Sequence, residues 1–249
     1  MHHQGGQTGV CGVRINRGGT LYAATFGKVG AEAVDPPIEK KPLYHFLPGT
    51  LSYSLGTIGC NFHCAHCQNW HISQQTLEME LLRDISPEQG VERAIRSGSA
   101  SIAWTYNEPT IWHEYPLAMG TLARQKGLGA VYVTNGYITE EGLRELAGML
   151  NAFRVDIKSF SDTFYRKVCG GRLQPILDAT ALAKEFGMHV ETVTLVIPGA
   201  ERLDGRDGDA HPVGAREPRP PPTPPRCTSP GSTPPTTGCS TRGRPRSGS

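Results

Sequence analysis

The chain is poor in aromatic residues, has no long apolar run and carries almost no net charge. Aromatic residues make up 7% of the 249 residues, and the formal net charge is +2. A charge balance this close to neutral gives no electrostatic reason to expect nucleic-acid or membrane binding. No stretch of about 18 apolar residues predicts a transmembrane helix, and the opening MHHQGGQTGV lacks the apolar core of a secretion signal. We therefore expect a cytoplasmic protein that binds neither nucleic acid nor membrane.

The last fifth of the chain has almost nothing to bury. Lys184, Phe186 and Leu203 are the last lysine, aromatic residue and leucine, whereas 11 of the 20 prolines lie in 212–249. Such a composition does not offset the entropy of ordering the chain, so we expect 201–249 to be a disordered, proline-rich tail. Two origins stay open: a proline-rich ligand for a partner domain, or an out-of-frame translation, which we favour. Resequencing the DNA around codon 200 separates them.

Three of the seven cysteines gather in one short stretch, GCNFHCAHCQNWHISQ, residues 59–74. Cys60, Cys64 and Cys67 have the spacing C-x3-C-x2-C, which is too close for a disulfide framework. A structural zinc site takes four ligands, usually from two separated pairs, so zinc would need a histidine in addition. A [4Fe–4S] cluster usually takes four thiolates, and with three it keeps one iron open for another ligand. Spacing alone leaves both metals open.

Strand and helix signals alternate from about residue 50 to 198. Apolar runs predict five strands, at 51–57, 101–106, 130–135, 153–158 and 189–199. Helical spacing predicts helices at 85–98, 112–127, 139–150 and 175–187. Such alternation is typical of parallel strands joined by helical crossovers. Five strands are too few for a closed eight-stranded barrel, so we predict an α/β fold with a partial, open parallel β/α barrel.

The first of these helices has a well-defined start signal. Ser86 is the expected N-cap, Pro87 occupies the first helical position and Gln89 completes a capping box. The apolar stripe expected to face the core is Val91, Ala94 and Ile95.

Four of the predicted strands end in cysteine, polar or charged residues. The first strand runs directly into the cysteine loop, and the others end in Asn107 and Glu108, in Thr134 and Asn135, and in Asp156 and Lys158. The carboxyl ends of parallel strands meet at one edge of the sheet, where sites form. Taken singly, each group is equally well explained as a polar turn or a structural ion pair. Their joint placement favours one cavity that all four strand ends share.

The cysteine loop resembles the cluster loop of radical S-adenosylmethionine (SAM) enzymes, in its spacing and at Gly59, Asn61, Gln68 and Asn69. More narrowly, the chain resembles the branch of pyruvate formate-lyase-activating enzymes, and within it the radical SAM member of the AmmeMemoRadiSam system. The segments that carry this resemblance are 11–22, 37–49, 67–74, 106–111, 133–137, 156–158 and 194–199. Together they cover the chain from about residue 7 to residue 200.

The resemblance implies that Cys60, Cys64 and Cys67 hold three irons of a [4Fe–4S] cluster and that SAM chelates the fourth. It places Asn107 and Glu108 at the ammonium of SAM. Nearer the rest of SAM or the substrate it places Thr134, Asn135, Asp156 and Lys158. The implied activity is that of an oxidoreductase: reductive cleavage of SAM to a 5′-deoxyadenosyl radical that abstracts hydrogen, in the manner of enzymes that activate glycyl-radical proteins. The implied partners are an electron donor such as flavodoxin or ferredoxin and a protein substrate, and no catalytic residue is assigned.

The chain departs from the family pattern at both ends. Family members carry further cysteines upstream of the segment that contains Cys11, so we assign Cys11 no metal. Their frame continues past 194–199 with more strands and helices. We therefore expect an amino-terminal extension at 1–49, a partial radical SAM core with an exposed apolar edge at 50–200, and the tail at 201–249. A non-catalytic zinc protein, using the three cysteines and one histidine, and an inactive truncated fragment are the alternatives.

Overall fold

Five parallel strands form one sheet in the order in which they follow one another along the chain. The computed structural model describes residues 8–35, 37–74 and 82–196, which all belong to one compact unit, Met1–Asp207. The parallel strands are β5 (Ser52–Gly56), β7 (Ser101–Trp104), β8 (Gly129–Thr134), β9 (Ala152–Asp156) and β10 (His189–Val193). The predicted α/β class and all five predicted strands are thus confirmed. The sheet of the described residues has two open edges, as a partial barrel requires.

A sixth strand, β4 (Ala31–Asp35), lies at the edge of this sheet and is missed by the sequence analysis. It pairs antiparallel with β5, from Ala31 opposite Gly56 to Asp35 opposite Ser52. Its run AEAVD has one β-branched residue, so its strand propensity is weak and the pairing decides its conformation. Two small ladders stand apart from the main sheet: β1 (Arg14–Arg17) with β2 (Thr20–Ala23), and β3 (Lys28–Val29) with β6 (Arg83–Asp84).

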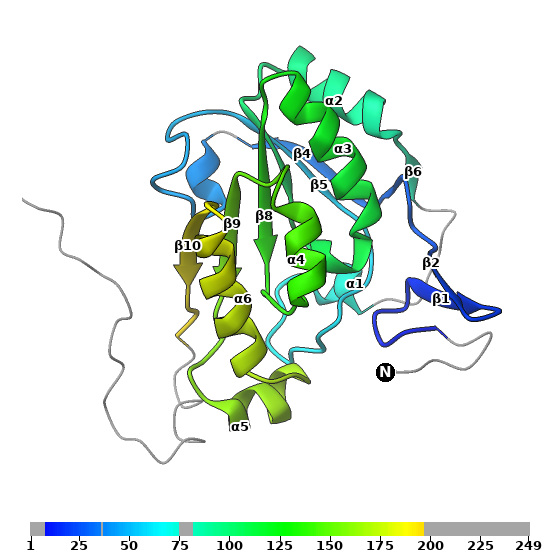
Figure 1. Ribbon diagram of the computed structural model, residues 1–249, viewed down its shortest axis with the longest axis vertical. Helices are drawn as coiled ribbons and strands as arrows, with labels where there is room; N and C mark the ends of the chain where they lie inside the picture. The colour runs from blue at the N-terminus through cyan, green and yellow to red at the C-terminus, as the bar shows by residue number, and fades with distance from the viewer. Residues whose placement is uncertain (1–7, 36, 75–81, 197–249) are drawn as a thin grey trace, which may run out of the picture. The chain divides into compact units, whose positions relative to one another are not determined.

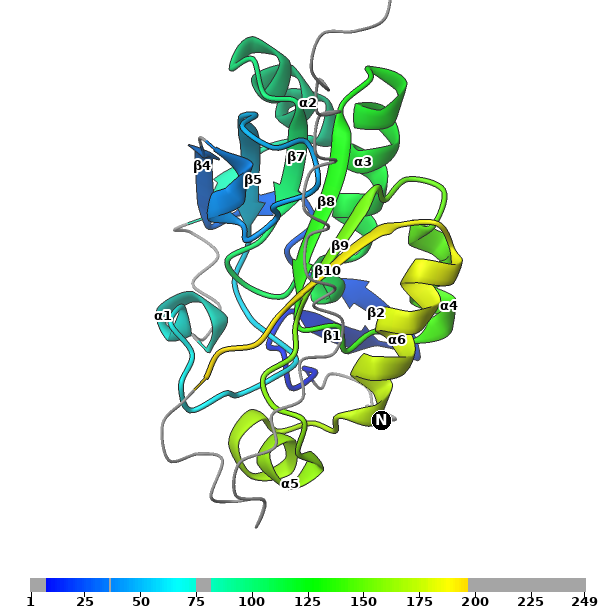
Figure 2. The same ribbon diagram turned by 90° about the vertical axis from the view of Figure 1, so that its left-hand side faces the viewer.

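Four helices lie along one face of the sheet, which we call the outer face (Figures 1 and 2). They are α2 (Pro87–Arg96), α3 (Glu114–Gln125), α4 (Glu140–Leu146) and α6 (Gln174–Glu185). Each falls within one of the four predicted helical segments, apart from one residue at the start of α6. Helix α4 is shorter than the predicted segment 139–150: it ends at Leu146, and Ala147 is its C-cap.

The predicted start of α2 is confirmed in detail. The Ser86 hydroxyl accepts from the Gln89 N–H, and the Gln89 side chain accepts in turn from the Ser86 N–H, which is the reciprocal capping box. Val91 and Ala94 are buried as expected. The prediction for Ile95 is wrong, since this side chain is 49% exposed. Helix α2 also buries Pro87 and Gly90, so its buried stripe is rotated away from Ile95 relative to the one predicted.

The two faces of the sheet have different side chains. Trp104, Tyr132 and Phe153 point from neighbouring strands toward the helices, and all three are fully buried in the main apolar core. The opposite, inner face carries a smaller apolar cluster, in which Ile38 and Leu43 pack on strand residues. Ile38 belongs to the short helix η1 (Ile38–Lys40), so the segment that follows β4 covers part of the inner face.

Short helices gather at the carboxyl end of the parallel strands. Figure 1 shows α1 and α5 at the end of the sheet to which the arrows of β8 and β10 point. These short elements are α1 (Trp70–Ser73), η3 (Pro109–Trp112), α5 (Asp162–Phe164) and the π-helical turn η4 (Tyr165–Cys169). They frame the edge at which the sequence predicts a site.

Several sequence predictions reach beyond what can be compared with the structure. The proline-rich tail, 201–249, lies outside the described residues. The division into 1–49 and 50–200 stays a prediction, although β4 joins the main sheet from the first of these segments. Within the part of the chain that the structure describes, no helix has the length and apolar character needed to cross a membrane.

Candidate functional site

The cysteine loop leaves the carboxyl end of β5 and is tied to the loop that follows β7. The Asn107 side chain accepts from the Thr57 N–H at 3.0 Å and donates to the Gly59 carbonyl at 3.1 Å. Further along, the Asn69 side-chain amide donates to the Tyr106 carbonyl at 2.7 Å. The two strand ends that were predicted to meet therefore do so through direct hydrogen bonds.

Gly59 opens the loop in a conformation that suits glycine. Its φ is +87°, and a Cβ at this position would lie 2.2 Å from the Cys11 carbonyl oxygen. Any larger residue would both strain the backbone and push away the segment of Cys11. The amino-terminal segment thus packs against the start of the cysteine loop, without any pairing of the Cys11 thiol in a disulfide.

The middle of the loop rests on η4. The N–H groups of His63 and Ala65 donate to the carbonyls of Cys169 and Val168, at 2.9 and 3.1 Å. Cys64 lies between these two bonds. Its interaction with the Cys169 thiol lowers the pKa of Cys64, and the same interaction, together with burial, raises the pKa of Cys169. Cys169 is fully buried and is a neighbour of the loop that the sequence analysis does not identify.

The three cysteines of the loop are free thiols in one electrostatic neighbourhood. Burial raises the pKa of the Cys60 thiol, and the charges of Glu108, Cys64 and Cys67 raise it further. The Cys67 sulfur lies 3.2 Å from the Ser73 hydroxyl of α1. Among residues 8–35, 37–74 and 82–196, no three His, Cys, Asp or Glu side chains gather closely enough to ligate a single metal ion.

His66 has unsatisfied nitrogens beside these thiols. Both of its ring nitrogens are buried without a hydrogen-bond partner among the described residues. Burial lowers the pKa of His66, and the charge of Lys158 lowers it further. Thiols are the donors that iron–sulfur clusters take, and unpaired buried polar atoms are expected where another group completes a site. The residues of the loop therefore fit a thiolate-ligated cluster.

Glu108 is a buried carboxylate that holds two strand ends together. It is 2% exposed. One oxygen accepts from the Thr110 N–H at 3.0 Å and the Thr134 hydroxyl at 2.7 Å, and the other accepts from the Asn135 N–H at 2.8 Å. Burial raises the pKa of Glu108, and these hydrogen bonds oppose the rise. Three of the roughly four acceptor positions of the carboxylate are thus used within the protein.

Asn135 extends the same network to the cysteine loop. Its side-chain amide donates to Asn61 at 2.7 Å and lies 3.8 Å from the Cys60 sulfur. Asn61 in turn donates to the Tyr137 carbonyl at 3.0 Å. The structure therefore brings together Asn107, Glu108, Thr134, Asn135 and the loop, in an arrangement where the side chains mainly fix one another.

Asp156 is the last residue of β9, and Lys158 follows two residues later. The Lys158 ammonium lies 2.8 Å from one Asp156 oxygen, and Arg154 pairs with the other. The charge of Lys158 acts on both Cys64 and His66, which places the ammonium near the cysteine loop. The predicted pair is thus part of a three-residue cluster, of which the sequence analysis identifies two members.

A second polar cluster on the inner face was also missed. The Tyr106 hydroxyl donates to Asp35 at 3.1 Å, and Asp35 pairs with the buried Lys41. The Lys41 ammonium lies 4.9 Å from the centre of the Tyr106 ring. Tyr106 has a φ of +73°, an unusual value for a non-glycine residue that is typical of strained functional loops. A positive φ and a contact across 71 residues have no signal in the sequence.

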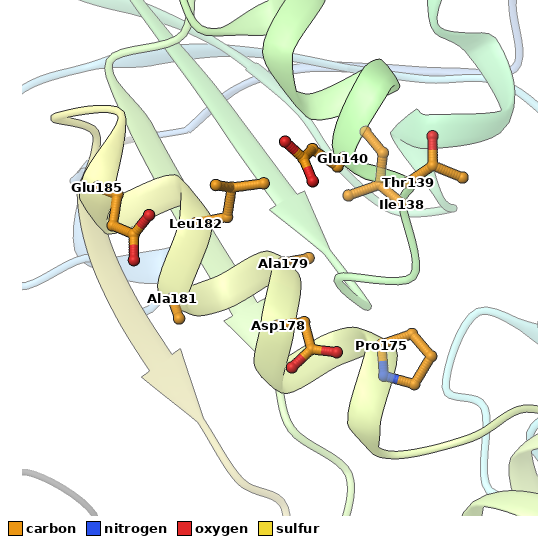
Figure 3. Close-up of a pocket in the computed structure, with 9 residues that line it drawn as sticks. All are labelled: Ile138, Thr139, Glu140, Pro175, Asp178, Ala179, Ala181, Leu182 and Glu185. Carbon is orange, nitrogen blue, oxygen red and sulfur yellow. The ribbon is translucent and has the colours of Figure 1, made fainter.

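A groove on the outer face lies away from these residues. It has a volume of about 480 Å³ and runs between α4 and α6. Figure 3 shows the carboxylates of Glu140, Asp178 and Glu185 along it, with Leu182 and Ala179 between them. None of the predicted site residues lines this groove.

Comparison with known proteins identifies a family and two relatives of this chain. A family model described as the radical SAM superfamily matches residues 55–204. Uncharacterized protein MJ0808 of Methanocaldococcus jannaschii is 46% identical over 193 residues, which are 78% of this chain and 57% of that protein. Uncharacterized protein MJ0674 of the same organism is 26% identical over 151 residues, or 59% and 43% of the two chains. The chain thus spans about half the length of the curated relatives it matches.

Solved structures with a similar backbone share little sequence with the chain. Streptococcus suis SuiB bound to the precursor peptide SuiA has 13% identity and a TM-score of 0.45, over 62% of this chain and 34% of that one. QueE from Escherichia coli has 13% identity and a TM-score of 0.39, over 71% and 86%. Similarity at this level carries no argument about function.

Proposed function

The chain belongs to the radical SAM superfamily, and on that premise we propose that it is an enzyme that cleaves S-adenosylmethionine reductively. The cofactors of this superfamily are a [4Fe–4S] cluster and SAM. The observation that carries the proposal is the position of the three free thiols. They follow the first parallel strand directly and share one loop at the carboxyl edge of the sheet, where α/β proteins bind their ligands.

Cys60, Cys64 and Cys67 would hold the cluster, and Cys11 and Cys169 would not. When bound, the cluster and SAM together supply an electron and a 5′-deoxyadenosyl radical that abstracts hydrogen from the substrate. The protein contributes a rigid loop. Asn107 fixes its start and the η4 carbonyls fix its centre, so that the backbone of the loop is held beside the strand ends.

The strand-end residues would position SAM next to the loop. Glu108 keeps about one free acceptor position, which suits an ammonium, since a carboxylate accepts hydrogen bonds only. Asn107, Thr134 and Asn135 would act mainly by fixing the loops around SAM, because their side chains bond to other protein groups. Asp156, at the end of β9, and Lys158, just after it, would contact SAM or the substrate.

We further propose the narrower assignments that the sequence suggests. The enzyme would be an oxidoreductase of the type that activates glycyl-radical proteins, in the branch of pyruvate formate-lyase-activating enzymes and the AmmeMemoRadiSam system. It would work in the cytoplasm, take an electron from a flavodoxin or ferredoxin and act on a protein substrate. Residues 50–200 would form its core, 1–49 an extension and 201–249 a tail. These assignments describe the activity of a full-length protein, because the chain spans only about half the length of its relatives.

Anaerobic reconstitution with iron and sulfide, followed by reduction with dithionite in the presence of SAM, tests the proposal. We expect iron and sulfide in near-equal amounts and formation of 5′-deoxyadenosine, measured by mass spectrometry. The double variant Cys60→Ser/Cys67→Ser should form none. Its matched control, Cys11→Ser, should form as much as the unmodified protein. Zinc without sulfide in the purified protein would support the non-catalytic alternative instead.

A further inference from the structure

One cation on the inner face has a donor without an acceptor. Arg154 is 6% exposed and alternates along β9 with Phe153 and Val155, which face the helices. It therefore points to the inner side of the sheet. Its Nη1 pairs with Asp156, whereas its Nε is buried and has no hydrogen-bond partner among the described residues. A buried donor in this state costs free energy unless another molecule supplies the acceptor.

The carboxylates around Arg154 are already engaged. Asp156 is shared with Lys158, so two cations face one anion and this cluster keeps one positive charge. Glu191 lies opposite Arg154 in the pairing of β10 with β9. It is held by other groups: the N–H groups of Tyr44 and His45, at 2.9 Å each, and the ring of His189, at 2.8 Å.

The free edge of the guanidinium has a defined shape. The Nε–H and Nη2–H bonds of an arginine point in the same direction, and together they match the two oxygens of a carboxylate. Asp156 takes Nη1, and Nε on this edge has no partner among the described residues. Arg154 also lies two residues before Asp156, which puts it roughly 6–7 Å further from the cysteine loop along the strand. A ligand that reaches from the cysteine loop to Arg154 would therefore lie along the inner face and pass Asp156.

We propose that Arg154 is a specificity-determining residue that binds a carboxylate group of the substrate through Nε and Nη2. The inference rests on the proposed radical SAM function, because that function makes the inner face the substrate's side of the site. It assigns the enzyme a substrate with an acidic group, held on the inner face with its reacting part toward the cysteine loop.

An NMR titration of the ¹⁵N-arginine-labelled full chain with sodium acetate tests this inference. Ionic strength is held constant with sodium chloride, and the variant Arg154→Lys identifies the Arg154 Nε–H signal by its loss. We expect this signal to shift progressively and to saturate. Arg14 and Arg166 are internal references, because their Nε–H groups already donate to the Ile111 carbonyl and to Asp162, at 2.8 and 2.5 Å. Their signals should stay in place.

Two outcomes would overturn the inference. If the Arg154 signal does not move with acetate, its partner is water and no anion site exists. If saturating SAM shifts the signal by itself and then prevents any response to acetate, Arg154 binds the carboxylate of SAM rather than that of a substrate. The titration needs no turnover, so it gives an answer even when 5′-deoxyadenosine does not form. Absence of that product would count against the proposed function alone.

Discussion

The two faces of the same sheet do different work. The outer face buries large side chains such as Trp104, Tyr132 and Phe153 beneath four helices. The inner face and the carboxyl edge carry buried serines such as Ser52 and Ser101, the Arg154–Asp156–Lys158 cluster and the cysteine loop. The outer face supplies most of the apolar burial that stabilises the fold, so the inner side can keep polar and strained groups.

Substitution in the cysteine loop should give the largest effect and leave the outer face untouched. Cys64→Ser should lose nearly all iron and sulfide after reconstitution, because three thiolates are the whole protein ligand set. Cys169→Ser, which alters the neighbouring buried thiol, should keep the full amount. Iron and sulfide assays with far-ultraviolet circular dichroism separate loss of the cluster from loss of the fold. Equal loss in both variants would mean that Cys169 is also a ligand.

Truncation on the outer face should have the opposite signature. Phe153→Ala should lower the free energy of unfolding by about 4 kcal/mol, since it removes a fully buried ring and leaves a cavity. On the inner face, Ser101→Ala removes a buried hydrogen bond to Ser52, of 3.0 Å, and should cost about 1 kcal/mol. Urea unfolding of both variants measures the difference. Similar losses would mean that the two faces of the sheet contribute equally to the free energy of unfolding.

The inner face has one pair whose loss should be costly. Asp35→Asn leaves the buried Lys41 ammonium without its partner and should lower the free energy of unfolding by about 3 kcal/mol at neutral pH. Burial alone would raise the pKa of Asp35, but the hydrogen bond and charge of Lys41 lower it below its ordinary value of 3.8.

The sign of this shift fixes the pH dependence. A lowered pKa in the folded protein contributes stability above the ordinary value, and this contribution is lost as the pH falls through the folded value. The difference between the unmodified protein and Asp35→Asn should therefore be constant near neutrality and shrink below pH 3.8. Urea midpoints from neutral to acid pH check this. A difference that grows on acidification would contradict the pairing.

An effect as small as that of Ser101→Ala is expected in the helical layer that covers the outer face. Ser86→Ala removes the hydroxyl that accepts from the Gln89 N–H at the start of α2. It should lower the free energy of unfolding by about 1 kcal/mol. Thr139→Ala offers a matched case, because the Thr139 hydroxyl accepts from the Gly142 N–H at the start of α4. Urea unfolding should give losses of similar size. A loss as large as that of Phe153→Ala would mean that α2 is held by its cap rather than by packing.

Local signals in the sequence predicted the elements that depend on local chemistry. Five strands, four helices and the Ser86 cap follow from periodicity and capping residues, which act over a few positions. Ile95 was misplaced because the buried stripe of α2 runs through Pro87 and Gly90, whose burial an apolar pattern does not reveal. Strand β4 was missed because its conformation depends on pairing with β5, not on its own residues.

The topology of the sheet predicted which strand ends lie together, but not how their side chains are bonded. The rule that ligands bind at the carboxyl ends of parallel strands correctly grouped Asn107, Glu108 and Asn135 with the cysteine loop. It did not reveal that protein donors occupy three acceptor positions of Glu108, or that Arg154 and Cys169 lie next to predicted residues. Those facts depend on side-chain partners from distant parts of the chain, which spacing does not encode.

Electron paramagnetic resonance of the reduced, reconstituted protein measures whether three thiolates leave one iron of the cluster open to SAM. We expect the spectrum of a reduced [4Fe–4S] cluster that changes on addition of SAM, with Cys11→Ser behaving in the same way. A cluster spectrum that SAM leaves unchanged, or a protein that takes up no iron and sulfide, would contradict it.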